Sequence, residues 1–165
     1  MSGTKRTKRS EDDPLTNSFK LSGYFPYKAR LFYTHVVGQI SQVYETAYGM
    51  RAFEWRTMAI LAENQPLTAA EVVEKSSMVK VTVSRAIARL RKRGWLIERT
   101  NRNDGRSKIL RLSSAGWRVY EDLTPKMLDA ERAVLSPLTP SETEELVRLM
   151  EKLRTGGNGS TGAAA

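Results

Sequence analysis

The sequence has 165 residues with 40% hydrophobic content, which suits one modest core, and 27 Lys and Arg against 18 Asp and Glu give a net charge of +9. It contains no cysteine and a single histidine, His35. This excludes disulfides, thiolate zinc sites and cysteine-based redox sensing, and it argues against histidine-based catalysis and against metal sites. No apolar run approaches the roughly 20 residues that cross a bilayer, and none follows the basic N-terminus, so we expect a cytoplasmic protein with no membrane partner.

The positive charge is concentrated in residues 80–111, which contain eleven Lys or Arg and only two acids, Glu98 and Asp104. This segment alone carries a charge of +9, whereas basic and acidic residues balance in the rest of the chain. An ordinary solvated surface mixes the two signs. The distribution therefore predicts a local surface that faces a polyanion.

In chain order, the first predicted feature is a disordered tail over residues 1–20, which mix charges with Ser, Thr and Pro. Apolar residues then recur at helical spacing from Tyr27 to Tyr48, and Gly49 is expected to end that helix. A second helix is predicted over residues 52–63, before the break at Pro66.

Two further helices follow in close succession. Thr68 and Glu71 form a capping box that predicts a short helix to about Lys75. The next helix is predicted to begin near Val79, without a Ser, Thr or Asp cap, and to end at Gly94.

A β-hairpin is predicted next, because residues 96–100 and 109–112 have strand character and Asp104-Gly105 between them is a hairpin-turn signal. Two strands are not stable alone, so the hairpin must pack against the helices. Residues 114–135 are expected to form a helix that is bent or interrupted near Pro125.

The last helix is predicted to begin at the capping box of Thr139 and Glu142. It carries Leu146, Leu149, Met150 and Leu153 on one face.

The helix from Val79 to Gly94 has the pattern of a groove-reading helix. Val83, Ala86, Ile87 and Leu90 fall on one side of a helical wheel, which predicts the core face. The opposite side offers cations for phosphates or guanine edges and short hydroxyls for backbone or bases. An ordinary amphipathic surface helix is the alternative for this pattern. The candidate DNA contacts in this region are Ser77, Lys80, Thr82, Ser84, Arg85, Arg89 and Lys92.

The hairpin supplies further candidate DNA contacts. Arg102 and Arg106 flank the turn, where long cationic side chains suit the minor groove. Asp104 is expected to brace Arg106 through a charge-assisted hydrogen bond, although turn chemistry alone also explains an aspartate there. Lys108 completes the predicted set.

Together these residues resemble the DNA-binding core of MarR-type regulators. The resemblance covers roughly residues 27–154, with two departures: Trp95 replaces a smaller aliphatic residue, and Ser113-Ser114 replaces the usual capping pair. It is carried by Leu67-Thr68 with Glu71, Val83-Ser84-Arg85, Leu90 before Gly94, Glu98-Arg99, Asp104-x-Arg106 and the leucine-rich strand that closes on Gly116.

The resemblance implies a mainly α fold with a small β-hairpin wing (α+β), that is, a winged helix-turn-helix with dimerisation helices at both ends. The recognition helix (79–93) would enter the major groove and the wing (99–108) the minor groove of a palindromic operator. The expected organisation is a tail (1–20), an N-terminal dimerisation helix (21–48), a DNA-binding lobe (49–113), C-terminal dimerisation helices (114–154) and a flexible tail (155–165).

Regulators of this type often release DNA when a small anionic, frequently aromatic, ligand binds between the dimerisation helices and the DNA-binding lobe. Aromatic walls with one or two cations would suit an aromatic carboxylate or its coenzyme A thioester. The alternative is that the aromatic side chains pack the dimer interface, and that His35 is a structural or surface residue. The candidate ligand-binding residues are Tyr27, Arg30, Tyr33, His35, Arg51 and Trp55.

The sequence therefore predicts a homodimeric repressor, not an enzyme, that binds double-stranded DNA and a small effector and needs no cofactor. An architectural protein without sequence preference would use the same basic segment, and steep salt dependence without preference among duplexes would reveal it. Two further alternatives are an enzyme acting on nucleic acid, which would need carboxylate pairs or metal ligands beside the basic face, and a winged helix that binds an acidic protein.

Overall fold

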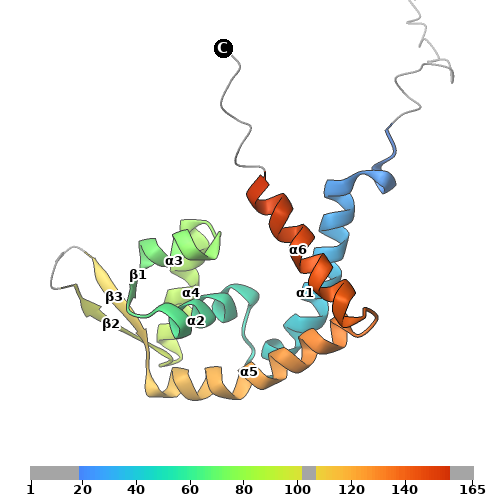
Figure 1. The fold of residues 1–165 in the computed structure, drawn as a ribbon. Helices are drawn as coiled ribbons and strands as arrows, with labels where there is room; N and C mark the ends of the chain where they lie inside the picture. Colours follow the sequence, from blue (N-terminus) through green and yellow to red (C-terminus); the bar gives the residue numbers. More distant parts are fainter. Residues whose placement is uncertain (1–18, 102–106, 157–165) are drawn as a thin grey trace, which may run out of the picture. The chain divides into compact units, whose positions relative to one another are not determined.

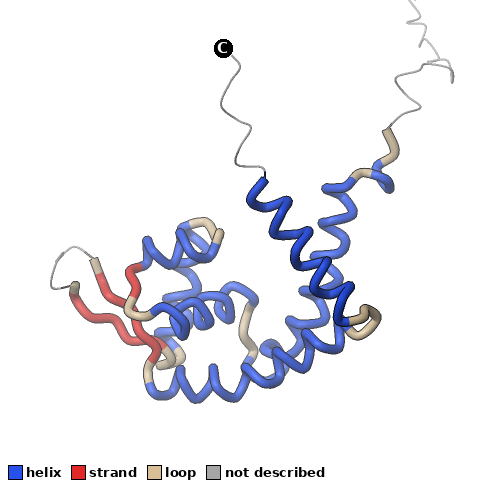
Figure 2. Tube along the Cα trace, viewed as in Figure 1, coloured by secondary structure: helices blue, strands red, loops and turns tan. Residues whose placement is uncertain are grey.

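The computed structural model describes residues 19–101 and 107–156. The chain divides after Gly38 into two compact units. The predicted mainly helical fold with a small β wing is confirmed (Figures 1 and 2). The elements are η1 (Leu21–Gly23), α1 (Phe25–Tyr48), α2 (Ala52–Asn64), β1 (Leu67–Thr68), α3 (Ala69–Ser76), α4 (Lys80–Lys92), β2 (Leu96–Thr100), β3 (Lys108–Leu112), α5 (Ser114–Leu135) and α6 (Pro140–Gly156).

The sheet has three antiparallel strands in the order β1-β3-β2. The predicted hairpin is confirmed, with Leu96 paired to Leu112 at its base and Thr100 paired to Lys108 toward its tip. β1 was not predicted as a strand, because Leu67 and Thr68 are too few to show an alternating pattern. Leu67 pairs with Leu110 and Thr68 with Ile109, so β1 is joined to the hairpin through β3.

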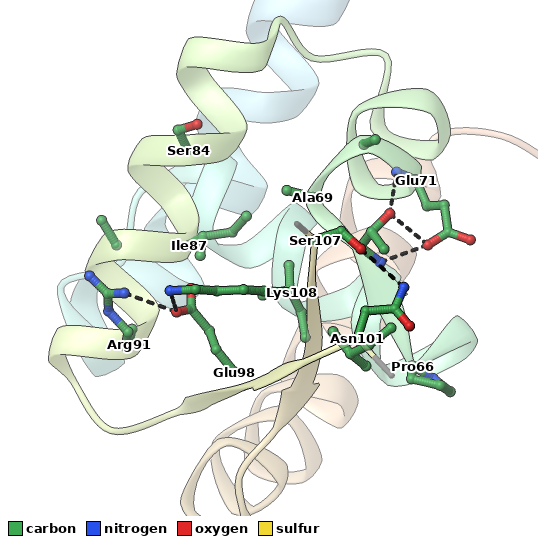
Figure 3. Close-up of a pocket in the computed structure, with 15 residues that line it drawn as sticks. Pro66, Ala69, Glu71, Ser84, Ile87, Arg91, Glu98, Asn101, Ser107 and Lys108 are labelled. Carbon is green, nitrogen blue, oxygen red and sulfur yellow. Dashed lines mark hydrogen bonds and ion pairs between the residues drawn. The ribbon is translucent and has the colours of Figure 1, made fainter. Parts of the chain in front are cut away.

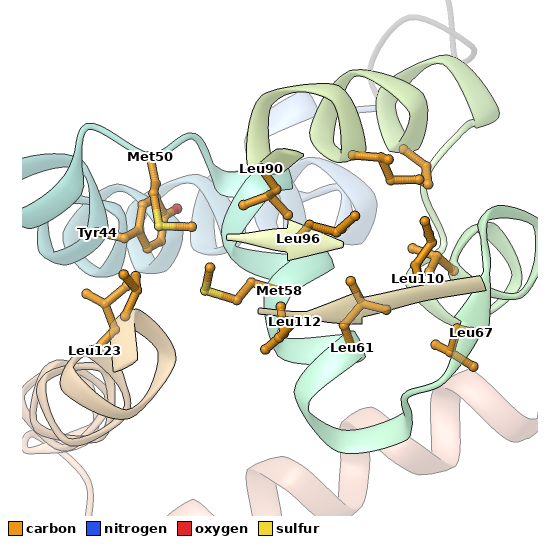
Figure 4. Packing of buried hydrophobic residues seen from close by; sticks show 14 residues of the cluster. Tyr44, Met50, Met58, Leu61, Leu67, Leu90, Leu96, Leu110, Leu112 and Leu123 are labelled. Carbon is orange, nitrogen blue, oxygen red and sulfur yellow. The ribbon is translucent and has the colours of Figure 1, made fainter. Parts of the chain in front are cut away.

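The hydrophobic core lies where α2, α4 and the sheet meet (Figure 4). The predicted core face of α4 is confirmed, since Val83, Ala86, Ile87 and Leu90 are all buried. Met58 and Leu61 of α2 and Leu96, Leu110 and Leu112 of the sheet pack into the same cluster, together with Tyr44 and Leu123. Truncation of a buried leucine such as Leu61 or Leu90 to alanine would cost about 2–5 kcal/mol.

The helix ends are determined by local chemistry. Gly49 and Gly94 have the positive φ values of 58° and 72° that end α1 and α4, as the sequence predicts. At the start of α3, the Thr68 hydroxyl accepts from the backbone N–H of Glu71, and the Glu71 carboxylate accepts from the backbone N–H of Thr68. α4 begins after Val79, which makes no side-chain capping bond.

Ser113 begins α5 and also closes the hairpin. Its hydroxyl accepts from the backbone N–H of Gly116 at 3.0 Å and donates to the carbonyl of Gly94 at 2.6 Å. Its own N–H donates to the carbonyl of Trp95 at 3.0 Å. The two ends of the hairpin are therefore tied to each other at its base.

The last two helices differ in two respects from expectation. α5 runs without interruption through Pro125, although the sequence allowed a break there. α6 extends to Gly156, past the predicted end at Arg154. Within the described residues, no helix combines the length and the apolarity needed to cross a membrane.

Candidate nucleic-acid interface

α3 and α4 form the helix-turn-helix unit. The turn between them is tight because Ser77 adopts a left-handed conformation with φ of 55°. The neighbouring Ser76 hydroxyl donates to the carbonyl of Val73 and accepts from the backbone N–H of Met78, both at 3.2 Å. These local bonds stabilise the turn that precedes α4.

The outward face of α4 brings together most of the predicted DNA contacts. Ser84, Arg85, Ala88, Arg89 and Lys92 are exposed on it. Lys80 at the start of the helix and Ser77 in the preceding turn are exposed as well, whereas Thr82 is half-buried. Cations and a hydroxyl thus surround a small side chain, Ala88, which lets a nucleic acid approach the helix closely.

A buried carboxylate lies behind this face. Glu54 of α2 is 0% exposed, and its Oε2 lies 3.0 Å from Nε of Arg89. Its Oε1 lies 3.5 Å from Nε of Arg93. The backbone N–H of Arg51 also donates to Oε2, at 2.9 Å. Arg89 is therefore an ion-paired residue, a feature that the sequence analysis missed.

The spacing of buried residues in α2 could have revealed Glu54. Glu54, Thr57, Met58 and Leu61 are all buried and follow the i, i+3, i+4, i+7 pattern of one helical face. An acid in such a stripe needs a cationic partner, since an unpaired buried charge is strongly destabilising.

Arg93 has a structural role. Its guanidinium donates to the backbone carbonyls of Tyr48 and Gly49, the latter at 2.8 Å, and lies 4.8 Å from the centre of the Trp95 ring. These contacts join the end of α4 to the connection between α1 and α2. Arg93 therefore contributes to the net charge of the basic segment but not to a free cationic surface.

Glu98 on β2 holds two more of the cations. Its Oε2 lies 3.0 Å from Arg91 of α4 and 3.1 Å from Lys108 of β3 (Figure 3). Burial raises the pKa of Glu98, but the hydrogen bonds from Lys108 and Arg91 outweigh burial and hold this pKa below its usual value. The three side chains line an open cleft of about 840 Å³ between α3, α4 and β3.

These ion pairs correct the expectation that the whole charge of residues 80–111 faces a polyanion. Four of its eleven cations, Arg89, Arg91, Arg93 and Lys108, pair with Glu54 or Glu98. Lys108 is a predicted DNA contact, and any phosphate must compete with Glu98 for its ammonium group. The predicted wing contacts Arg102, Asp104 and Arg106 lie outside the described residues.

The candidate ligand residues fall in both units. Tyr27, Arg30, Tyr33 and His35 belong to the first unit, and Arg51 and Trp55 to the second. The Trp55 ring is half-buried and stacks against Tyr44 and Tyr120, with ring centres 6.4 and 5.8 Å away. Trp55 therefore packs against other aromatic side chains of its own unit. The alternative interpretation in the sequence analysis also gave the aromatic residues a packing role, although at the dimer interface.

Trp55 also lines a cavity of about 260 Å³ within the second unit. Its walls come from α1, α2 and α5 and are largely apolar, and they include two carboxylates, Glu63 and Glu131. The full lining is Ile40, Trp55, Ala59, Glu63, Tyr120, Thr124, Met127, Leu128 and Glu131.

Comparison with known proteins agrees with the sequence resemblance. Residues 48–107 match the family model of the MarR family. The HTH-type transcriptional regulator YwoH of Bacillus subtilis is 28% identical over 102 residues, which cover 62% of this chain and 74% of that protein.

Solved structures share the fold. BpsR of Bordetella bronchiseptica, whose DNA binding is regulated by 6-hydroxynicotinic acid, has a TM-score of 0.77 at 20% identity, over 82% of this chain and 96% of that one. Sco3205, a MarR family transcriptional regulator of Streptomyces coelicolor solved in complex with DNA, has a TM-score of 0.75 at 22% identity, over 90% of this chain and 94% of that one. The predicted resemblance to MarR-type regulators is confirmed.

Proposed function

We propose that this chain, which resembles regulators of the MarR family, binds DNA and acts as a homodimeric repressor of a palindromic operator, relieved by a small aromatic acid or its coenzyme A thioester. The observation that carries the sequence-specific part of the proposal is the outward face of α4. Arg85, Arg89 and Lys92 stand there beside Ser84 and the small Ala88, all exposed. Such a face can both approach phosphates and reach base edges in the major groove.

The proposed homodimer is supported by exposed apolar side chains. Described residues of α6 include none that is buried, yet Val147, Leu149, Met150 and Leu153 are large, apolar and exposed. Leu146 on the same helix is half-buried, so the apolar face of α6 is exposed in large part. On α1, the large side chains of Phe25, Leu31, Phe32 and Tyr33 are exposed as well. Single exposed hydrophobic residues are ordinary, but several on one helix call for a covering surface. A second copy would also place two α4 helices for half-sites about one DNA turn apart.

The proposed effector is a small aromatic carboxylate or its coenzyme A thioester. BpsR, which shares the fold, responds to an aromatic acid. In this chain Trp55 and Tyr120 give the cavity of about 260 Å³ an aromatic wall. Because Glu63 and Glu131 also line that cavity, we place the ring of the effector against the aromatic wall and its carboxylate on a cation outside it, with Arg51 of the same unit as the candidate.

Operator binding tests the proposal directly. The purified chain is titrated with the promoter region beside its own gene and with a random duplex of equal length, at near-physiological salt. A preference for the promoter of about 10³-fold or more is expected. Equal affinity for both duplexes, with a steep salt dependence, would instead support the architectural alternative.

A further inference from the structure

We propose that Glu54 is a positioning residue that sets the orientation of Arg89 for base reading, an inference that rests on the proposed operator binding. The two residues come from different helices, α2 and α4. Glu54 is 0% exposed, whereas the Arg89 side chain is 45% exposed. The ion pair therefore runs from the core outward, and its exposed end lies on the face that would meet DNA.

Stability of the fold alone does not explain why a carboxylate is buried at position 54. Removing a carboxylate from water costs several kcal/mol, and an apolar residue of similar volume often serves a fold equally well. In addition, Oε1 of Glu54 has no hydrogen-bond partner among the described residues and faces Nε of Arg93 only at 3.5 Å. The carboxylate is thus best satisfied on the side of Oε2, where Arg89 lies.

The geometry of Arg89 suits base reading. Nε of Arg89 lies 3.0 Å from the buried Glu54 carboxylate, and this ion pair restricts the positions that the planar guanidinium group can take. The ion pair is made through Nε, so it does not itself use the two terminal amino groups. These two groups form the edge that pairs with O6 and N7 of guanine in the major groove.

Neighbouring arginines do not share this arrangement. Arg93 also contacts Glu54, but both of its terminal amino groups donate to backbone carbonyls, those of Tyr48 and Gly49. Arg85 is exposed on the same face as Arg89 and makes no ion pair with any residue that the structure describes. Arg85 is therefore the matched control: it is an arginine on the same face that no ion pair orients.

The inference predicts an unusual signature for the Glu54→Gln variant. Loss of the carboxylate charge frees Arg89 to follow phosphates, so affinity for random DNA should stay unchanged or rise. Affinity for the operator should fall, because the oriented fork is lost, and the preference for operator over random duplex should drop about tenfold. A residue with a purely structural role would instead weaken binding to both duplexes together.

The experiment compares wild type, Glu54→Gln, Arg89→Lys and the double variant on operator and random duplex, with melting temperatures measured in parallel. Arg89→Lys keeps the charge but lacks the fork, so it should lose the same preference, and the double variant should lose no more. Arg85→Ala should add its own loss to that of Glu54→Gln. Substitution of 7-deazaguanine for each operator guanine should weaken wild-type binding at one symmetric pair of positions and be silent there in both single variants.

Two results would overturn the inference. One is an equal loss of affinity for both duplexes in Glu54→Gln. The other is an unchanged operator preference in Arg89→Lys, whose exposed position keeps the test valid even where Glu54→Gln unfolds. If the wild type itself shows no operator preference, the proposed function fails, and this outcome is seen before any variant is compared.

Discussion

The backbone of Gly116 in α5 lies directly against the carbonyl group of Trp95. A Cβ atom at position 116 would stand 2.1 Å from the Trp95 oxygen and 3.0 Å from its carbonyl carbon. This carbonyl cannot retreat easily, because it also accepts the N–H of Ser113. The start of α5 therefore packs on the base of the hairpin with a close backbone-to-backbone contact at Gly116.

Gly116→Ala should destabilise the protein, although alanine is the better helix former by about 1 kcal/mol. The clash with a fixed backbone group should cost more than this gain, for a net loss of about 1–3 kcal/mol in the free energy of unfolding. Urea unfolding measures it. Ser114→Ala, an exposed position in the same helical turn, is the control and should change stability little. A Gly116→Ala protein as stable as wild type would show that Trp95 can move.

Acid pH should weaken the connection between the hairpin and α4. Hydrogen bonds from Lys108 and Arg91 hold the pKa of Glu98 below its ordinary value of 4.5. A depressed carboxyl pKa adds stability that is fully present above that ordinary value and is lost as pH falls through the depressed one.

The measurement is the unfolding free energy of wild type and Glu98→Gln from pH 3 to pH 7. The wild type should be the more stable protein at neutral pH, and the difference should shrink on acidification below about pH 4.5. Glu121→Gln, at an exposed position on α5, is the control. If the difference in unfolding free energy between wild type and Glu98→Gln does not vary with pH, the ion pairs of Glu98 do not stabilise the protein.

The apolar face of α6 should be the surface through which two copies associate. Arginine at both Met150 and Leu153 would place two charges in that surface, so the protein should become a monomer of 18.6 kDa by light scattering. Operator affinity should fall with it, because two half-sites are no longer bound together. Lys152→Ala on the same helix should stay dimeric. A dimeric Met150→Arg/Leu153→Arg protein would exclude this face.

Effector binding should depend on the carboxylate of the ligand. Benzoate and its hydroxylated derivatives should raise the melting temperature and release the operator, whereas the matched amides should do neither. Glu63→Gln removes one acid from the lining of the cavity and should strengthen binding of the acids several-fold, because it removes a repulsion. Release by the amides but not by the acids would reverse the assigned charge, and no response to any of them would reject this effector class.

Much of the fold can be predicted because its signals are local. Gly49 and Gly94 end helices where the sequence expects them to, and the Thr68–Glu71 box starts α3. The core face of α4 follows from periodicity alone. β1 could not be found in this way, since two residues become a strand only when β3 lies beside them.

The candidate site was less predictable, because pairing between helices decides which cations are free. Arg89 and Lys92 look alike on a helical wheel, yet only Arg89 meets Glu54. The sequence places Glu54 among aromatic residues of α2 and gives no direct sign of its partner. Likewise, the sequence predicts that Lys108 is a free cation of the wing, whereas the structure pairs it with Glu98.

The hydrogen bond from Ser113 to Gly94 has a consequence for how such a protein can change. Because the hairpin is fastened at its base, the core does not depend on the length of the segment that joins β2 to β3. Each doubling of such a segment costs only about 0.6 kcal/mol in closure entropy. The segment between Thr100 and Lys108 should therefore be exchangeable: a longer, shorter or differently charged one can be grafted there, and we expect the rest of the lobe to fold as before.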